Sequence, residues 1–259
     1  MKTLFTAIGA GAIALSLFAG PTVPARAAEG ASAPPDLDWS FEGFFGTYDR
    51  GAAQRGLQVY FEACAGCHSM DLLAYRNLGD LGYDEEEVKA IAAQYFVIDG
   101  PDGDGEMFER PALPSDKFVS PYANEQQARL FNNGAYPPDL SLIAKARLHG
   151  PDYLAALLTG YEDTPPDGSE LMPGMSYNAY FPGHQIAMPQ VLYDDGIGYA
   201  DGTPPTAAQQ ARDVATFLMW AAEPKLEDRN RMGVKVVLYL IVFAGVMYGV
   251  KRRVWAKLH

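Results

Sequence analysis

The residues with the clearest chemistry in this sequence are two cysteines and the histidine that follows them. Cys64 and Cys67 are the only cysteines among the 259 residues, and His68 comes directly after the second. This is the spacing of covalent haem c attachment. Two thiols one helical turn apart can each add to a vinyl group at the porphyrin edge, while the next imidazole binds the iron. The motif therefore predicts one covalently bound haem c, with His68 as an iron ligand.

Other chemistry for the two cysteines has less support. A structural zinc site needs about four ligands, and the others would have to come from His149, His184, His259 or distant carboxylates. A thioredoxin-like pair would require a βαβ context, which is not visible, and a disulfide would close a tiny, strained loop. Two alternatives to an electron carrier stay open: a membrane-anchored thiol–disulfide oxidoreductase that uses Cys64 and Cys67, and a haem-based ligand sensor.

Spacing does not identify the second iron ligand. An electron-transfer haem usually has a ligand on each face, and a methionine thioether gives a higher potential than a second imidazole. Two loops that contain prolines carry the candidates Met175 and Met188. Residue types favour these two equally, and His149 and His184 remain as imidazole alternatives.

The N-terminus has the pattern of a secretory signal peptide. Lys2 precedes an apolar run, and Ala25-Arg26-Ala27 is a small-x-small cleavage signal. We expect residues 1–27 to be the signal peptide and residues 28–231 to form an exported domain, although an uncleaved anchor helix would show the same run. Export agrees with haem c, which bacteria attach outside the cytoplasm.

A second apolar run, residues 232–250, is long enough to cross a bilayer and contains one charge, Lys235. A buried core helix is the alternative interpretation. Residues 251–259 are expected to form a cytoplasmic tail, because the signal peptide places the body of the protein outside. The sequence thus predicts a single-pass protein of the bacterial inner membrane with its haem domain in the periplasm.

The exported domain is strongly acidic. The whole chain has 20 basic and 32 acidic residues and a formal net charge of -12. Seven of the basic residues lie in the predicted leader, span and tail, so the net charge of the exposed domain is more negative still. Such a field attracts cationic partners and repels nucleic acid.

Helical periodicity predicts a mostly α fold in which two distant helices cross. In the first, residues 49–63, Gly56, Tyr60 and Cys64 recur at four-residue spacing and so share one face. A glycine on that face allows another helix to approach closely. The best partner is residues 206–222, and this pairing is similar to the class I cytochrome c fold with long loop insertions.

The chain around these helices is predicted to hold shorter elements. The segment 39–48 is expected to be an ordered strap. An acidic turn is expected at 99–106, rather than a calcium site, because the oxygen spacing of an EF-hand is not met. Further helices are predicted over 83–95, 123–131, 141–149 and 152–159, and mostly loop over 162–202.

Longer motifs extend from Trp39 to the membrane anchor. They are Trp39-Ser-Phe, Gln54-Arg-Gly-Leu-Gln-Val-Tyr60, Cys64-Ala-Gly-Cys-His-Ser-Met70, Leu73-Ala-Tyr-Arg76, Asp99-Gly-Pro-Asp-Gly-Asp-Gly-Glu-Met-Phe108, Asn132-Asn-Gly-Ala-Tyr-Pro-Pro-Asp-Leu-Ser141, Leu158-Thr-Gly-Tyr161, Tyr180-Phe-Pro-Gly183, Ile186-Ala-Met188 and Trp220-Ala-Ala-Glu-Pro224. Together they resemble the cytochrome c1 family, the haem c subunits of the ubiquinol–cytochrome c reductase (bc1) complex.

The resemblance implies roles for individual residues. It makes Met188 the axial partner of His68, and it suggests that Arg129 pairs with a haem propionate, a contact that suits a planar guanidinium. It also reveals a departure. With Cys64 and Cys67 used for haem, this chain cannot form the extra disulfide that some bacterial members carry.

The resemblance also implies partners and a function. The haem would take one electron from the Rieske iron–sulfur protein and pass it to a soluble cytochrome c or c2, in a complex whose cytochrome b subunit oxidises quinol. The subunit itself would make and break no bonds. An acidic face, with candidates at 84–87 and 102–109, would speed the encounter with a basic cytochrome.

Overall fold

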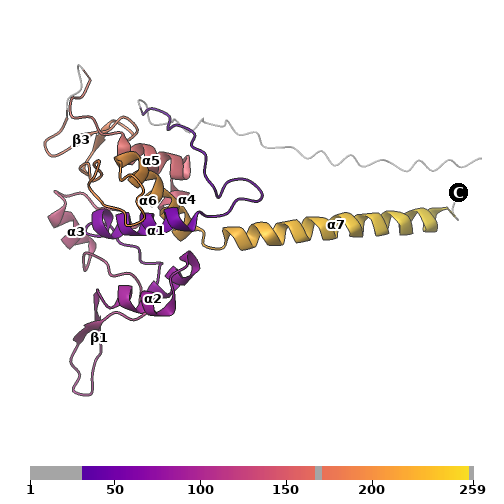
Figure 1. The fold of residues 1–259 in the computed structure, drawn as a ribbon, viewed down its shortest axis with the longest axis horizontal. Helices are drawn as coiled ribbons and strands as arrows, with labels where there is room; N and C mark the ends of the chain where they lie inside the picture. The colour runs from indigo at the N-terminus through magenta and orange to yellow at the C-terminus, as the bar shows by residue number, and fades with distance from the viewer. Residues whose placement is uncertain (1–30, 167–170, 257–259) are drawn as a thin grey trace, which may run out of the picture.

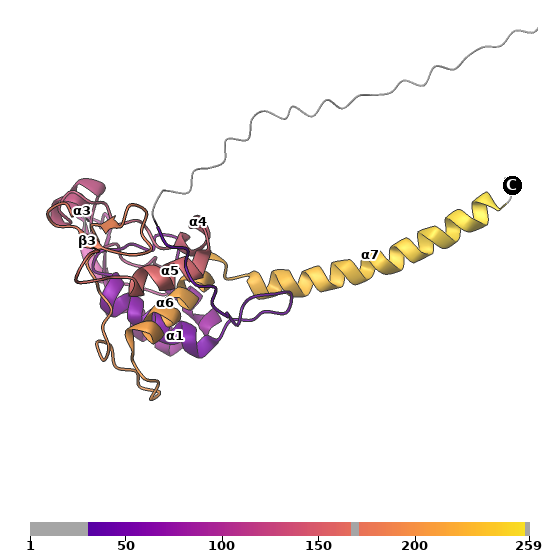
Figure 2. The same cartoon turned by 90° about the horizontal axis from the view of Figure 1, so that it is seen from above.

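The computed structural model describes residues 31–166 and 171–256, which form a helical body and one long helix that leaves it (Figures 1 and 2). The predicted signal peptide, residues 1–27, lies outside the described residues. In chain order the elements are α1 (Arg50–Val59), the π-helix η1 (Tyr60–Cys64), the 3-10 helix η2 (Tyr75–Leu81), α2 (Glu85–Ala92), β1 (Phe96–Asp99), β2 (Phe108–Pro111), α3 (Glu125–Phe131), α4 (Ile143–Ala146), α5 (Gly150–Thr159), β3 (Ser176–Tyr177), β4 (Gln185–Ile186), α6 (Ala207–Ala222) and α7 (Leu226–Trp255). The prediction of a mostly helical fold with one C-terminal apolar helix is confirmed.

The centre of the body is the crossing of α1 and α6, the two helices predicted to pair. Each begins with a side-chain cap. The Asp49 carboxylate accepts a hydrogen bond from the N–H of Ala52 at 3.0 Å, and the Thr206 hydroxyl accepts one from the N–H of Gln209 at 3.1 Å. These bonds satisfy N–H groups that a helix start otherwise leaves without partners. Both helices therefore begin at fixed residues.

Gly56 is the point of closest approach between the two helices. A Cβ atom at this position would overlap the carbonyl oxygen of Asp213 and lie 2.7 Å from the Cβ of Phe217. One turn further along, the rings of Tyr60 and Phe217 pack with their centroids 5.9 Å apart. The close crossing predicted from the glycine is present, and it leaves no space for a side chain.

A buried ion pair fixes the register of this crossing. The guanidinium of Arg55 donates two hydrogen bonds to the carboxylate of Asp213, at 2.9 and 3.0 Å, and a third to Asp201 at 2.8 Å. Asp213 is buried, and the Gln209 amide donates to it as well. Since a buried charge without its partner is costly, a shift of one helix along the other is disfavoured.

Two predicted helices are shorter than expected. The helix predicted over 83–95 is reduced to α2, because Asp84 and Glu87 form a capping box that begins the helix at Glu85. The helix predicted over 141–149 is reduced to the single turn α4. It ends because the backbone of Arg147 is extended.

The predicted acidic turn at 99–106 closes a β-hairpin that the sequence analysis did not predict. β1 and β2 pair antiparallel over four residues each. Arg110 donates to Asp99 across the pair, and the Asp102 carboxylate accepts two backbone N–H groups within the turn. The two strands are largely exposed, so ion pairing and main-chain bonds hold the hairpin more than burial does.

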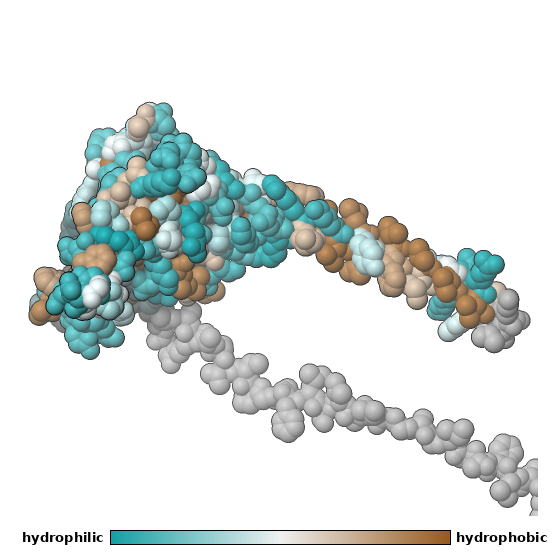
Figure 3. Space-filling model, turned by 90° about the horizontal axis from the view of Figure 1, so that it is seen from below, coloured by the Kyte–Doolittle hydropathy of each residue, from teal (hydrophilic) through white to brown (hydrophobic). Residues whose placement is uncertain are grey.

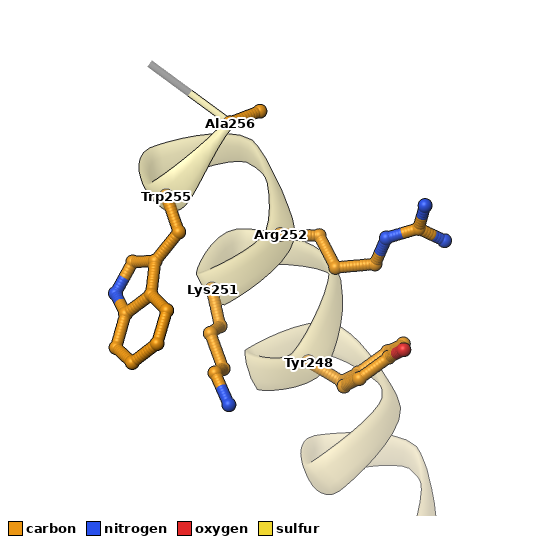
Figure 4. Close-up of a pocket in the computed structure, with 5 residues that line it drawn as sticks. All are labelled: Tyr248, Lys251, Arg252, Trp255 and Ala256. Atoms are coloured by element: carbon orange, nitrogen blue, oxygen red, sulfur yellow. The ribbon is translucent and has the colours of Figure 1, made fainter. Parts of the chain in front are cut away.

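α7 is long and apolar enough to cross a membrane, and it contains the predicted span 232–250. Figure 3 shows apolar residues along most of this helix, whereas the visible face of the body is mainly polar. At its C-terminal end the Lys251 ammonium lies 4.6 Å from the ring centroid of Trp255 (Figure 4). Basic and aromatic side chains at a helix end are typical of a membrane interface.

We expect Gly56→Ala to lower the free energy of unfolding by about 3 kcal/mol, near the upper end of the usual cost of overpacking, because the new methyl group overlaps backbone atoms of α6. Denaturant unfolding of the full-length holo-protein in detergent, followed by haem absorbance, measures this loss.

Gly51→Ala is the matched control on the same helix, where the added Cβ would lie no closer than 3.4 Å to a side-chain atom. This variant should keep its stability or gain up to about 1 kcal/mol, since alanine is the better helix former. Equal losses in both variants would contradict the role given to Gly56.

Candidate haem-binding site

The haem motif lies in the turn that follows the π-helix η1. The N–H of Ala65 donates to the carbonyl of Tyr60 at 2.8 Å, the wider bond that defines a π turn. The N–H groups of Cys67 and His68 both donate to the carbonyl of Cys64, at 3.0 and 2.9 Å. These bonds fold the motif into one compact turn.

The two thiols differ in environment. Cys64 is buried, Cys67 is exposed, and no disulfide joins them. Burial, with a smaller effect from Cys67, raises the pKa of the Cys64 thiol to about 12. A dithiol that exchanges disulfides needs the opposite, a lowered thiol pKa. The buried Cys64 thiol is therefore poorly suited to thiol–disulfide exchange. One inner and one outer thiol on a single turn suit two attachment points along the edge of a planar ring.

The imidazole of His68 is held in the orientation that an iron ligand requires. Its Nδ1 lies 2.7 Å from the carbonyl oxygen of Pro138. With Nδ1–H donating to that carbonyl, the lone pair of Nε2 is free to bind a metal, which is the usual arrangement of a ligating histidine. Burial lowers the pKa of His68, although the Pro138 carbonyl acts in the opposite direction. A lowered pKa favours the neutral imidazole, the form that binds a metal, so this residue fits a haem iron.

Asp139 holds the chain on either side of this contact, a role that the sequence analysis did not assign. Its carboxylate accepts from the Ser69 hydroxyl, the N–H of Asp71 and the N–H of Ser141, each at 2.8 Å. Burial acts to raise the pKa of Asp139, but these hydrogen bonds outweigh it and the pKa lies below its usual value. The only sequence signal was the Pro-Pro-Asp-Leu-Ser block that contains this residue.

Aromatic side chains support the motif from the protein interior. The hydroxyl of Tyr60 donates to the carbonyl of His68 at 3.1 Å. The ring of Phe118 packs against those of Tyr60, Phe61 and Tyr75, with centroids 4.8 to 5.9 Å apart. The haem motif thus rests on a packed aromatic layer.

The loop that carries Met188 is tied to the body. Met188 is half-buried, and its carbonyl oxygen accepts from the Tyr161 hydroxyl at 3.0 Å. The buried amide of Asn178 donates to the carbonyl of Leu157 on α5 and accepts two backbone N–H groups of its own loop. Met175 is half-buried in the same region. Burial therefore does not separate the two methionines.

Of the two alternative imidazole ligands, His184 has local partners. His184 stacks on Tyr177 with ring centroids 5.3 Å apart, and its Nδ1 lies 3.2 Å from the carbonyl oxygen of Asn178. His149 has a left-handed backbone at the start of α5. Within residues 31–166 and 171–256, no group of three or more His, Cys, Asp or Glu side chains is placed to hold a metal ion.

Arg129 lies on α3 and is bound to its own segment. Its guanidinium pairs with Glu125 at 2.7 Å, donates to the carbonyl of Gly134 at 2.9 Å and lies over the ring of Tyr136. α3 and the β3–β4 hairpin both lie at the end of the body remote from α7 (Figures 1 and 2). The C-terminal end of α1 also faces away from α7, because Arg50 at its other end pairs with Glu227 of that helix.

Comparison with known proteins gives a family match over most of the chain. The family model described as "Cytochrome C1 family" matches residues 39–258. "Cytochrome b/c1" of Bradyrhizobium diazoefficiens is 49% identical over 98% of this chain, which spans only 40% of that protein. "Cytochrome c1 1, heme protein, mitochondrial" of Arabidopsis thaliana is 50% identical over 90% of this chain and 75% of its own length. "Cytochrome b-c1 complex catalytic subunit, mitochondrial" of Candida albicans is 48% identical over 88% of this chain and 80% of its own length.

We expect Asp139→Asn to lower the free energy of unfolding at pH 7 by about 1–3 kcal/mol, because an amide has one acceptor oxygen and leaves a buried donor without a partner. The pKa of Asp139 is depressed in the folded protein. Its stabilisation is therefore present above the unfolded pKa of about 3.9 and is lost as the pH falls through the folded pKa. Unfolding curves from pH 7 to 3 should show the two proteins converging in acid.

Asp71→Asn provides the control for this change. The Asp71 side chain accepts one hydrogen bond, from the Ser120 hydroxyl at 2.6 Å, and the amide retains an acceptor oxygen. We expect an effect within about 0.5 kcal/mol. A comparable loss in this variant would show that Asp139 has no special role.

Proposed function

Because the chain belongs to the Cytochrome C1 family, we propose that it relays single electrons from the Rieske iron–sulfur protein to a soluble cytochrome c or c2. It carries haem c and is a subunit of the cytochrome b–c1 complex. The observation that carries the proposal is the orientation of His68, whose Nδ1 lies against the carbonyl of Pro138 and whose Nε2 is free for iron. Haem c supplies an iron that accepts and releases one electron.

Four side chains hold the haem in this proposal. Cys64 and Cys67 would form the two thioether links to the haem, and His68 and Met188 would bind its iron. The tether from the Met188 carbonyl to Tyr161 supports this assignment, because it limits the freedom of the ligand loop. With both of these residues bound, the iron would have no position for substrate, so the subunit would transfer electrons and catalyse no bond chemistry of its own.

Arg129 is proposed as the partner of a haem propionate. Its position on α3, at the end of the body remote from α7, supports the assignment. Its present pairing with Glu125 is an exposed ion pair between neighbouring helix turns. Such pairs contribute little to stability, so a second carboxylate can share or replace this contact at small cost.

The membrane topology follows from the two apolar segments. We propose a signal peptide at 1–27, a periplasmic domain at 28–231, a span at 232–250 across the inner membrane and a cytoplasmic tail at 251–259. The Lys251–Trp255 contact supports an interface at the C-terminal end of α7 (Figure 4). The raised pKa of the Cys64 thiol speaks against a thiol–disulfide oxidoreductase. The relatives of this chain are named as cytochromes, so they do not favour a haem-based sensor either.

Reduced absorption spectra of the wild type, Met188→Leu and Met175→Leu test the ligand assignment. Met188→Leu should lose the low-spin spectrum and bind carbon monoxide in the reduced state, because an iron position becomes open. Met175→Leu, the matched control from the same loop region, should behave as the wild type. If only the Met175 variant loses the low-spin spectrum, the assignment is wrong.

Electron transfer to a basic soluble cytochrome c should slow with added salt, by on the order of ten-fold between about 0.01 and 0.3 M ionic strength. The reason is the acidic surface, which includes Glu85 and Glu86 at 82% and 84% side-chain exposure. Stopped-flow rates with the intact complex measure the effect. A rate independent of salt would contradict electrostatic steering. The double variant Glu85→Gln/Glu86→Gln should show a lower rate at low salt if these two carboxylates contribute to the steering.

A further inference from the structure

Two large apolar side chains stand exposed at the tip of the strap that precedes α1. Phe44 is 54% and Phe45 is 80% exposed, and their rings pack edge to face with centroids 5.2 Å apart. By contrast, Phe41 and Tyr48 on either side of them are buried. The strap thus anchors its two ends in the body and turns only its tip outward.

The tip has a defined shape. The N–H of Thr47 donates to the carbonyl of Ser40 at 2.9 Å and closes the loop. Gly43 has a φ of +75°, which side chains rarely adopt. Gly46 is buried, and a Cβ atom there would overlap the backbone of Phe41. The two phenylalanines are therefore presented by a specific fold and do not lie on a loose connection.

The loop is also fixed to the first turn of α7. The N–H of Tyr48 donates to the carboxylate of Glu227 at 2.9 Å, and Arg50 pairs with the same carboxylate at 3.1 Å. The hydroxyl of Tyr48 donates to the carbonyl of Glu223, between α6 and α7, at 3.0 Å. Both views show the loop before α1 extending past the start of α7, in the direction in which that helix runs (Figures 1 and 2).

This direction leads to the bilayer. The apolar part of α7 begins at Met232, six residues after Leu226, which is about 9 Å along a helix. The polar layer of a bilayer is roughly 5–8 Å deep on each side of the hydrocarbon core. A loop held at Glu227 that extends past the start of α7 therefore reaches the depth of the lipid headgroups. Amphipathic and aromatic segments at this depth bury their apolar side chains among the acyl chains.

We propose that Phe44 and Phe45 insert into the outer surface of the lipid bilayer beside α7 and form a second membrane contact of the body. The proposal rests on α7 spanning the membrane. A single helix would leave the body free to tilt, because it supplies one attachment point. With Phe44 and Phe45 as a second point, the body keeps one face and one angle toward the membrane plane.

Spin labelling tests the depth of the tip. The two native cysteines carry haem, so a cysteine introduced into the full-length holo-protein is its only free thiol. Labels are placed by Phe45→Cys and, independently, Phe44→Cys, in phosphatidylcholine vesicles. Val246→Cys in α7, 57% exposed, is the reference within the membrane, and Met107→Cys on the hairpin turn, 59% exposed, is the aqueous reference. The measurement is the ratio of oxygen to nickel-chelate accessibility, which rises with depth in the bilayer.

The ratio at positions 44 and 45 should be several-fold higher than at 107 and approach the value at 246. If the label at position 246 has the ratio of a bilayer site while the labels at positions 44 and 45 have the same ratio as the label at position 107, the insertion is wrong and the membrane span stands. If the label at position 246 also has the ratio of an aqueous site, the membrane span is wrong, and the insertion that depends on it is wrong as well. If the tip is aqueous in vesicles and becomes shielded from both reagents only in the assembled complex, it contacts another subunit, and the proposal is overturned.

Discussion

The contact of α1 with α6 at Gly56 is the constraint on which the rest of the structure depends. One end of α1 is held beside α7 through Arg50 and Glu227, and the other passes through η1 into Cys64. The glycine fixes the distance between the helices, and the Arg55 ion pair fixes their register. A single rigid element therefore connects the membrane end of the body with the haem end.

The haem motif is not autonomous, because its histidine takes its orientation from a distant segment. The carbonyl of Pro138 accepts a hydrogen bond from the imidazole of His68, about 70 residues earlier in the chain. The carboxylate of the next residue, Asp139, accepts hydrogen bonds from Ser69 and Asp71, which follow His68. The carboxylate does not touch the imidazole. It fixes the two chain segments between which the imidazole lies, as groups behind a metal ligand would have to do if His68 binds the iron.

Sequence reasoning found the helices whose apolar faces and caps are long and regular, and it found the haem motif from residue types alone. It missed the β1–β2 hairpin because these short strands are exposed and bear no clear alternation. Residue types alone did not separate Met188 from Met175, because both lie in a region whose shape depends on the buried amide of Asn178. The assignment to Met188 came from the family resemblance. The role of Asp139 was hidden for a similar reason, since its partners include Ser69, far away in the chain.

The π turn at Tyr60–Cys64 has a consequence for how this segment can change during evolution. A π turn holds one residue more than the α turn it replaces, and each residue of an α-helix advances the chain by about 100° around the axis. Deleting one of the residues 60–63 would shorten this turn to a regular α turn and move Cys64 to a different side of the helix. The number of residues in this segment is therefore as constrained as its buried Tyr60 and Cys64, because an insertion or deletion here would move the cysteine relative to an otherwise intact α1–α6 core.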